Sequence, residues 1–369
     1  MSDILQNTLY LITPGSLVTQ DHLTLQVEVP VYPSDLPDEK RERKMATDFR
    51  KLSLPIHHLE SICLFGASTI TAPALHLCWA HGVAVNYLTE NGYLQARMTG
   101  VSDTSVMLRR AQFRAADNVE KSASIARRMI AGKIQNSRNS LLRGARENES
   151  AEEQQRLQYG VDALGRQLRR LESTMTDGGR SRNPLDPLRG VEGTAAEDYF
   201  SAFTLLLKQQ RADFAYTGRS RRPPRDRINC LFSFLYALVR HDCIAALTSI
   251  GLDPFVGFLH VDRPNRPSLA LDLMEEFRPW LADRLAVTLI NRQQLNSEHF
   301  RERGGGAVEF TDKGRKIAIQ AYQERKKETL AHSLLGQQLR IGQLPFVQAR
   351  ILARHLRGDI ADYTPFVPK

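Results

Sequence analysis

Cysteine is scarce in this chain, with four in 369 residues. The four lie in apolar surroundings without C-x-x-C spacing, so neither a zinc knuckle nor a disulfide framework is indicated; they are Cys63, Cys78, Cys230 and Cys243. No apolar run approaches the roughly 20 residues that span a bilayer, and the N-terminus lacks the basic start and apolar stretch of a secretory signal. A G-x-x-x-x-G-K-S/T phosphate loop is absent too. We therefore expect a cytoplasmic protein with reduced cysteines and no membrane partner.

Positive charge is in excess. There are 50 Lys and Arg against 41 Asp and Glu, which gives a formal net charge of +9. Basic side chains held near phosphates release counterions when a nucleic acid binds, so this balance favours a polyanionic partner. The hydrophobic content of 42% is that of an ordered globular protein, and the length suggests about two domains.

The first hundred residues show short, strand-like patterns. Strands are predicted over residues 8–12, 17–18, 23–29, 52–56, 61–65, 83–88 and 93–98. The last two are joined through Asn91-Gly92, the strongest short hairpin signal, and residues 72–79 are predicted to form one helix, with Pro73 near its start. We expect a small β-rich domain over residues 1–100.

Beyond residue 100 the patterns become long, amphipathic and helical. Helices are predicted over residues 105–134, 152–175, 228–250, 312–333 and 344–357, and another contains Glu192. The helix over 228–250 is apolar nearly all round, as expected of a buried central helix ending at Gly251. The predicted fold class is α+β, with the β-rich domain followed by a larger all-α domain over residues 101–369.

A candidate metal site lies in this second part. Gly257-Phe258-Leu259-His260 precedes a loop and then a helix that Ser268 can cap and that carries three carboxylates, Asp272, Glu275 and Glu276. Glu192 lies on an otherwise apolar helical face and needs a partner. An imidazole with two carboxylates suits Mg²⁺ or Mn²⁺ and leaves positions open for a phosphate oxygen. The spacing leaves open which of the three helix carboxylates would touch the metal.

Simpler interpretations compete with each of these residues. A lone glutamate on an apolar face is usually satisfied by an arginine, and a lone histidine such as His260 is more often a hydrogen-bonded core residue. The three helix carboxylates could merely favour the first turns of their helix through the dipole. The combination of Glu192, His260 and the acidic helix is what favours a metal site.

Arginines near these residues are candidates for phosphate contact. Several follow one another in a loop that Pro223-Pro224 holds extended: Arg219, Arg221, Arg222, Arg225 and Arg227. Arg266 lies between His260 and Ser268, and Arg278 follows Glu275. We expect Arg219, Arg221, Arg222, Arg266 and Arg278 to contact nucleic acid, whereas the alternative for the loop is a solvated surface.

These motifs resemble the CRISPR-associated integrases of spacer acquisition, the Cas1 family. The resemblance rests on Glu192-Gly193 before Ala195-Ala196 and Tyr199-Phe200, Arg222-Pro223-Pro224 ahead of Asn229, Gly251-Leu252-Asp253-Pro254, and Gly257-Phe258-Leu259-His260 leading to Ser268-Leu269-Ala270-Leu271-Asp272-Leu273. The family usually has Gly before the loop arginine, where this chain has Asn265; asparagine also tolerates the left-handed conformation. The segment 354–363 is similar to the type I subtype C branch.

The resemblance implies that Glu192, His260 and Glu275 hold the metal, with Asp272 as an additional acidic position. It implies an endonuclease and integrase of CRISPR adaptation, which inserts captured double-stranded DNA fragments as spacers by attack of a 3′-hydroxyl on a repeat phosphodiester. A small partner protein, Cas2, is implied as well. Insertion at two ends needs paired active sites, so we expect a homodimer formed through the N-terminal β-rich domain.

Two other functions remain open at this stage. One is a metal-dependent DNA or RNA nuclease outside CRISPR, with water as nucleophile at the same residues. The other is a non-catalytic basic DNA-binding scaffold in which Glu192, His260 and Glu275 are structural.

Overall fold

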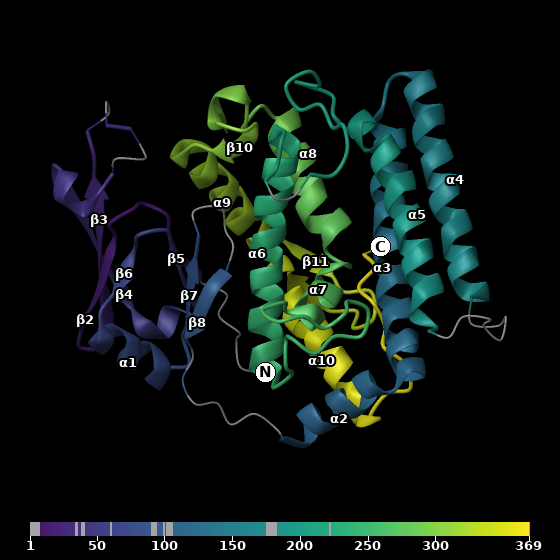
Figure 1. Ribbon diagram of the computed structural model, residues 1–369, viewed down its shortest axis with the longest axis horizontal. Helices are drawn as coiled ribbons and strands as arrows, with labels where there is room; N and C mark the ends of the chain where they lie inside the picture. Colours follow the sequence, from purple (N-terminus) through teal and green to yellow (C-terminus); the bar gives the residue numbers. More distant parts are fainter. Residues whose placement is uncertain are drawn as a thin grey trace. The chain divides into compact units, whose positions relative to one another are not determined.

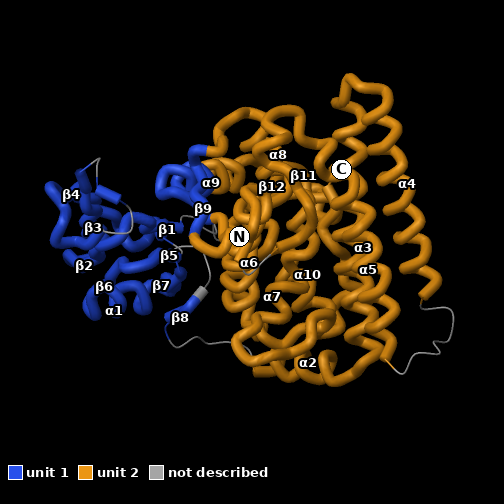
Figure 2. The backbone as a smooth tube through the Cα atoms, turned by 45° about the horizontal axis from the view of Figure 1, so that its top comes forward, with its two compact units in different colours: residues 1–103, 298–303, 309–319 blue, residues 104–297, 304–308, 320–369 orange. Residues whose placement is uncertain are grey.

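A computed structural model gives the fold. It describes residues 8–33, 36–37, 41–59, 61–89, 94–98, 100, 106–174, 183–220 and 223–368. The chain divides into two compact units, coloured separately in Figure 2. Unit 1 comprises residues 1–103, 298–303 and 309–319, and unit 2 comprises residues 104–297, 304–308 and 320–369. Two later segments thus join the N-terminal unit, which a single boundary near residue 100 does not anticipate.

Unit 1 contains two four-stranded sheets and a helix. One sheet has the order β1-β5-β7-β8 and the other β4-β3-β2-β6. The elements are β1 (Thr8–Leu11), β2 (Leu17–Asp21), β3 (Thr24–Val31), β4 (Asp48–Pro55), β5 (Ser61–Phe65), β6 (Thr69–Ile70), α1 (Ala72–Ala80), β7 (Ala84–Leu88) and β8 (Leu94–Met98). The N-terminal part is therefore β-rich, as predicted.

The first sheet explains two features of the sequence. Strand β5 pairs in parallel with β1 on one side and with β7 on the other, and all five of its residues are buried. A parallel strand covered on both faces has no polar face, so its sequence does not alternate. Strands β7 and β8 are antiparallel, as predicted; the Asn91-Gly92 turn itself lies outside the described residues.

Unit 2 is built mainly from helices (Figure 1). They are α2 (Val106–Asp117), α3 (Val119–Glu147), α4 (Ala151–Ser173), α5 (Leu185–Phe203), α6 (Arg227–Ile250), α7 (Ser268–Met274), α8 (Arg284–Asn291) and α10 (Leu344–Arg357), with α9 (Asp312–Lys327) divided between the units. The single helix predicted over 105–134 is wrong, because Asn118 ends α2 and caps α3 by accepting a hydrogen bond from the Lys121 backbone N–H.

Shorter helical turns complete the chain. A π-helical segment (Arg278–Asp283) joins α7 to α8. Turns of 3₁₀ helix occur at Arg43–Met45, Ile56–His58, Thr204–Leu206, Ser297–His299 and Ile341–Gln343. All four cysteines are buried and none forms a disulfide.

Helix α6 packs against α7, α8 and α10, while α3, α4 and α5 lie side by side (Figure 1). By length and composition α6 could cross a membrane, but 78% of its apolar window is buried inside the protein. The expectation that no apolar run approaches this length is therefore wrong, and the predicted burial of this helix is confirmed. Gly251 ends α6 with φ +92°, a left-handed conformation that glycine adopts without strain.

The C-terminal region is mostly helical rather than all-α. Strands β9 (Phe300–Arg303) and β10 (Ala307–Phe310) form a hairpin around the Gly304 to Gly306 turn. Strand β11 (Thr329–Ala331) pairs with β12 (Gln338–Arg340). The helix predicted over 312–333 therefore ends at Lys327, because the residues after it pair with a strand that local periodicity does not reveal.

Candidate metal and nucleic-acid site

The turn that carries His260 is organised by a buried carboxylate on α7. Asp272 accepts hydrogen bonds from the backbone N–H groups of Phe258 at 2.6 Å, Leu259 at 3.0 Å and His260 at 3.0 Å. It also lies 2.6 Å from Nδ1 of His260. A carboxylate at Nδ1 favours the tautomer with the proton on that nitrogen, which leaves Nε2 as a ligand. Asp272 therefore orients the imidazole. Its role is more than a favourable interaction with the dipole of its own helix, the simpler interpretation considered from the sequence.

Close packing holds this turn against α7. A Cβ added to Gly257 would lie 2.8 Å from Oδ2 of Asp272, so the approach needs glycine. Buried Gln112 on α2 donates to the carbonyl oxygens of Asp253 and Val256. The predicted cap is wrong: the N-cap residue of α7 is Pro267, and the Ser268 hydroxyl instead donates to the Val261 carbonyl oxygen at 3.3 Å.

A lysine joins the two predicted glutamate ligands. The ammonium of Lys133, on α3, makes an ion pair with Glu192 on α5 and another with Glu275 at 2.8 Å. Arg278 contacts the other oxygen of Glu275, with Nη1 2.7 Å from Oε1. The exposed side-chain fractions are 28% for Glu192, 14% for Lys133 and 2% for Glu275. The partner that Glu192 needs is thus a lysine shared with Glu275.

The charges of this group support one another. Burial opposes ionisation of Glu275, yet the nearby Arg278 and Lys133 cations outweigh it and lower its pKa to about 2. Burial likewise opposes the Lys133 ammonium, but the carboxylates of Glu275 and Glu192 raise its pKa above the usual value. At neutral pH Glu275 is a carboxylate and Lys133 an ammonium.

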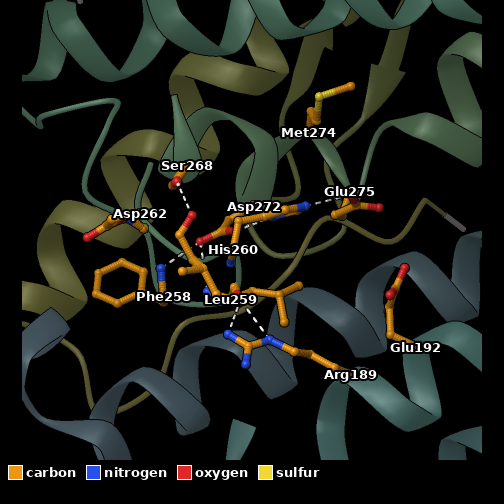
Figure 3. Close-up of polar contacts among 12 residues, drawn as sticks. Arg189, Glu192, Phe258, Leu259, His260, Asp262, Ser268, Asp272, Met274 and Glu275 are labelled. Atoms are coloured by element: carbon orange, nitrogen blue, oxygen red, sulfur yellow. Dashed lines mark hydrogen bonds and ion pairs between the residues drawn. The ribbon is translucent and has the colours of Figure 1, made fainter. Parts of the chain in front are cut away.

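His260 completes the predicted set. Its Nε2 lies 4.0 Å from Oε1 of Glu275, and Figure 3 shows its ring between the carboxylates of Asp272 and Glu275. Among the described residues, no group of three or more His, Cys, Asp or Glu side chains is arranged to hold a metal ion. Instead, Lys133 lies between Glu192 and Glu275. The donor set of one imidazole nitrogen and two carboxylates fits Mg²⁺ or Mn²⁺ by its chemistry, and the assignment of these ligands stays a prediction.

Glu276 faces a different environment from its neighbour Glu275. It is fully buried and accepts hydrogen bonds from the Tyr363 hydroxyl at 2.5 Å, the Gln348 amide at 3.0 Å and the Phe366 backbone N–H at 2.7 Å. Burial raises its pKa to about 8, although these donors act in the other direction. Its oxygens are thus occupied by protein donors, as those of Asp272 are, so Glu275 is the strongest of the three candidate ligands.

The predicted phosphate-binding arginines have different positions. Arg219 and Arg278 lie over the ring of Tyr236, 5.4 and 4.9 Å from its centroid, and Arg219 donates to Oδ1 of Asn229 at 2.5 Å. Arg266 is half-buried in the loop before α7. Asn265 before it has φ +60°, the left-handed conformation expected there. Arg221 and Arg222 lie outside the described residues.

A cavity of about 570 Å³ opens beside these groups within unit 2. Its lining includes Lys133, Glu192, Arg219, Tyr236, Arg278 and Asp283. The Tyr236 hydroxyl donates to Asp283 at 2.6 Å, and burial raises the pKa of Asp283 to about 7. The cavity brings two guanidinium groups next to the carboxylates, which is suited to an anion such as a phosphodiester.

Sequence reasoning missed two residues of this site. Lys133 had a signal: it shares an α3 face with Met129, Ile130 and Ser137, so it is a lysine on a buried helical face. Arg189, one turn before Glu192, donates to the Leu259 carbonyl oxygen at 2.8 Å, as Figure 3 shows. Arg189 thereby joins the helix of Glu192 to the turn of His260, a contact between segments distant in sequence that no local pattern reveals.

Comparisons with known proteins identify the family. The sequence profile of the family described as CRISPR associated protein Cas1 matches residues 9–324. A CRISPR-associated endonuclease Cas1 from Moorella thermoacetica is 43% identical over 372 residues, covering 99% of both chains.

Solved structures share the fold. A casposase bound to integration product superposes with a TM-score of 0.79 at 22% identity, over 97% of this chain and 92% of the other. A chain of a Cas6-RT-Cas1–Cas2 complex does so with a TM-score of 0.76 at 21% identity, over 100% of this chain and 37% of the other. The predicted resemblance is confirmed, and this chain belongs to the Cas1 family of CRISPR-associated endonucleases.

Proposed function

We propose that this protein integrates captured DNA fragments into a CRISPR repeat array at the site formed by Glu192, His260 and Glu275. One observation carries the proposal: two glutamates, one on α5 and one directly after α7, meet at one cation, with Nε2 of His260 4.0 Å from Oε1 of Glu275. The cavity beside them is lined by Arg219 and Arg278. This combination provides ligands for a metal and cations for a phosphodiester.

In this proposal Glu192, His260 and Glu275 hold Mg²⁺ or Mn²⁺. The metal, when bound, supplies stabilisation of the negative charge that develops on the phosphoryl and leaving oxygens. Asp272 holds the imidazole through Nδ1, so Nε2 keeps its lone pair for the metal. Arg278 and Arg219 orient the phosphodiester by charge and hydrogen bonding.

The reaction we propose is a transesterification. The 3′-oxygen of the fragment forms a new bond to the repeat phosphorus, and the bond from that phosphorus to the repeat's own 3′-oxygen breaks. The hydroxyl proton leaves the attacking oxygen, and a proton is taken up by the departing one. One phosphodiester replaces another, so no nucleotide triphosphate is consumed.

The proposed partners are double-stranded DNA, a second copy of this chain and a small Cas2 protein. The fold shared with a casposase bound to integration product and with a Cas1–Cas2 complex supports this set. The homodimer would form through the β-rich domain of residues 1–100, and residues 101–369 would carry catalysis and DNA binding. The cytoplasm is the proposed compartment, and subtype I-C remains a prediction from the segment 354–363.

Strand transfer tests the proposal. A labelled 3′-hydroxyl duplex is incubated with a plasmid carrying a leader and repeat, the small partner protein and Mn²⁺. The wild type is compared with Glu192→Ala and His260→Ala. Joined product from the wild type alone is the expected result. Cleavage without joining would favour the nuclease outside CRISPR, and equal behaviour of all three proteins would favour the DNA-binding scaffold.

A further inference from the structure

Lys133 is a mostly buried lysine that lies between two carboxylates. Its ammonium contacts one carboxylate on α5 and another just after α7, and its side chain is 14% exposed. Gly132, the residue before it, lies against Pro365 and Glu276, where an added Cβ would come within 2.7 Å of Pro365. The backbone of α3 is therefore closely packed at this point, which fixes the position from which the Lys133 side chain extends to the carboxylates.

The charges around Lys133 already balance. Glu192 and Glu275 carry two negative charges, and Lys133 and Arg278 carry two positive ones. A divalent cation that binds both carboxylates adds two positive charges next to the ammonium, which is unfavourable in a buried site. Either the metal stays out or one of the resident cations moves away.

Lys133 is the cation that can move. Arg278 lies over the ring of Tyr236. Of the two glutamates it makes an ion pair with Glu275 only, so it does not bridge the carboxylates. Lys133 does bridge them, and it also lines the 570 Å³ cavity, which offers space for its flexible side chain. Moving the ammonium toward the cavity frees an oxygen of each glutamate at once.

We propose that Lys133 is a positioning residue that acts as the site's own cation, which joins Glu192 to Glu275 before metal binds and which a divalent ion must displace. This inference rests on the metal site of the proposed function. It adds a regulatory property to that site: the ammonium competes with the metal and holds the metal affinity of the DNA-free protein below what the three ligands alone would give.

Direct Mn²⁺ binding to the DNA-free protein tests this competition. Free Mn²⁺ is followed by electron paramagnetic resonance during titration of the wild type, Lys133→Met and Lys133→Gln. Both variants are expected to bind Mn²⁺ more tightly, by about tenfold or more, because the competing charge is gone. Lys133→Arg keeps a cation and is expected to show no gain, and Lys121→Met, at an exposed lysine of the same helix, serves as the matched control.

Thermal unfolding provides the second readout. Without metal, Lys133→Met leaves Glu192 unpaired and is expected to melt below the wild type, while Mn²⁺ raises its melting temperature more than that of the wild type. Unchanged or weaker Mn²⁺ affinity in both neutral variants would overturn the proposal. If one of them fails to fold, the other decides.

The failure of this inference can be told apart from failure of the proposed function. His260→Ala is added to the wild type and to Lys133→Met. If His260→Ala abolishes Mn²⁺ binding but Lys133→Met gives no gain, the metal site stands and the role of Lys133 is wrong. If Mn²⁺ binding survives His260→Ala in both backgrounds, the metal site itself is wrong, and the competition falls with it.

Discussion

Glu275 and Glu276 are neighbours in the chain, and both are buried, yet their surroundings differ completely. Glu275 faces Lys133 and Arg278, and its pKa is lowered to about 2. Glu276 faces Tyr363, Gln348 and Phe366, all neutral donors, and its pKa is raised to about 8. Burial raises the pKa of both groups; the cations beside Glu275 outweigh it, whereas the neutral donors around Glu276 do not. We call the surroundings of Glu275 the reactive side of this segment and the surroundings of Glu276 its packed side.

The largest effect we expect is on the reactive side. Glu275→Gln removes a charge that both Lys133 and the proposed metal need, so strand transfer should fall by about a thousandfold or more. Glu276→Gln keeps the shape of the packed side, although its amide replaces one acceptor oxygen by a donor, and it removes no group from the proposed metal site. A folded variant should therefore stay within about tenfold of the wild type. A similar loss of strand transfer in both would mean that the two sides are not separate.

Asp272→Asn should give the next largest effect. An asparagine amide replaces one acceptor oxygen by a donor, although both oxygens of Asp272 accept backbone N–H groups. The free energy of unfolding should fall by about 3 kcal/mol, measured by urea denaturation. Asp162→Asn, at an exposed position on α4, is the control and should change little. An unchanged midpoint for Asp272→Asn would show that the turn does not depend on the carboxylate.

Glu276 should make stability depend on pH. Its folded-state pKa of about 8 exceeds the ordinary 4.5, so the folded protein binds the proton more tightly than the unfolded chain. The stability from this group is complete below pH 4.5 and is lost as the pH rises through about 8. The slope should approach about 1.4 kcal/mol per pH unit within that window.

Urea denaturation between pH 4.5 and 8 measures this slope, and Glu276→Gln should remove the part that comes from Glu276, leaving the part that comes from Asp283, whose pKa is raised to about 7. Glu152→Gln, at an exposed residue of α4, should leave the slope as it is. The metal-free contribution of Glu275 has the opposite sign, because its stability is present above pH 4.5 and is lost as the pH falls through about 2. If the unfolding free energy of the wild type rose with pH between 4.5 and 8, that result would contradict the assignment for Glu276.

The smallest effect should come from Tyr363→Phe. It removes the hydroxyl that donates to Glu276 at 2.5 Å and leaves the buried ring in place. We expect a loss of about 1–2 kcal/mol in unfolding free energy, and strand transfer by the folded protein should remain within about twofold. A strong loss of strand transfer without a loss of stability would show that the packed side also controls the reactive one.

The sequence predicted much of the fold where local patterns are strong. Strand β5 and helix α10 have the predicted bounds, 61–65 and 344–357. The patterns failed where distant partners decide: β11 forms because β12 pairs with it, and Asn118 divides a periodic run because its side chain caps α3. Local periodicity contains neither piece of information.

The candidate site shows the same division. His260 and the acidic helix were found because they lie close together in sequence. Lys133 and Glu192 are 59 residues apart, and Arg189 and Leu259 are 70 apart, so these contacts depend on how α3, α5 and α7 pack. The opposite surroundings of Glu275 and Glu276 follow from that packing too, and residue type alone does not distinguish the two.

The hydrogen bonds of Asp272 have a mechanical consequence. They fasten the His260 turn to α7, and Glu275 follows directly after that helix, so His260 and Glu275 belong to one rigid body. Glu192 belongs to another body, α5, which Arg189 joins to the His260 turn, while Lys133 on α3 joins Glu192 to Glu275. The separation of α5 from the α7 body thus sets the distance from Glu192 to His260 and Glu275, and the contacts of Lys133 and Arg189 hold that separation.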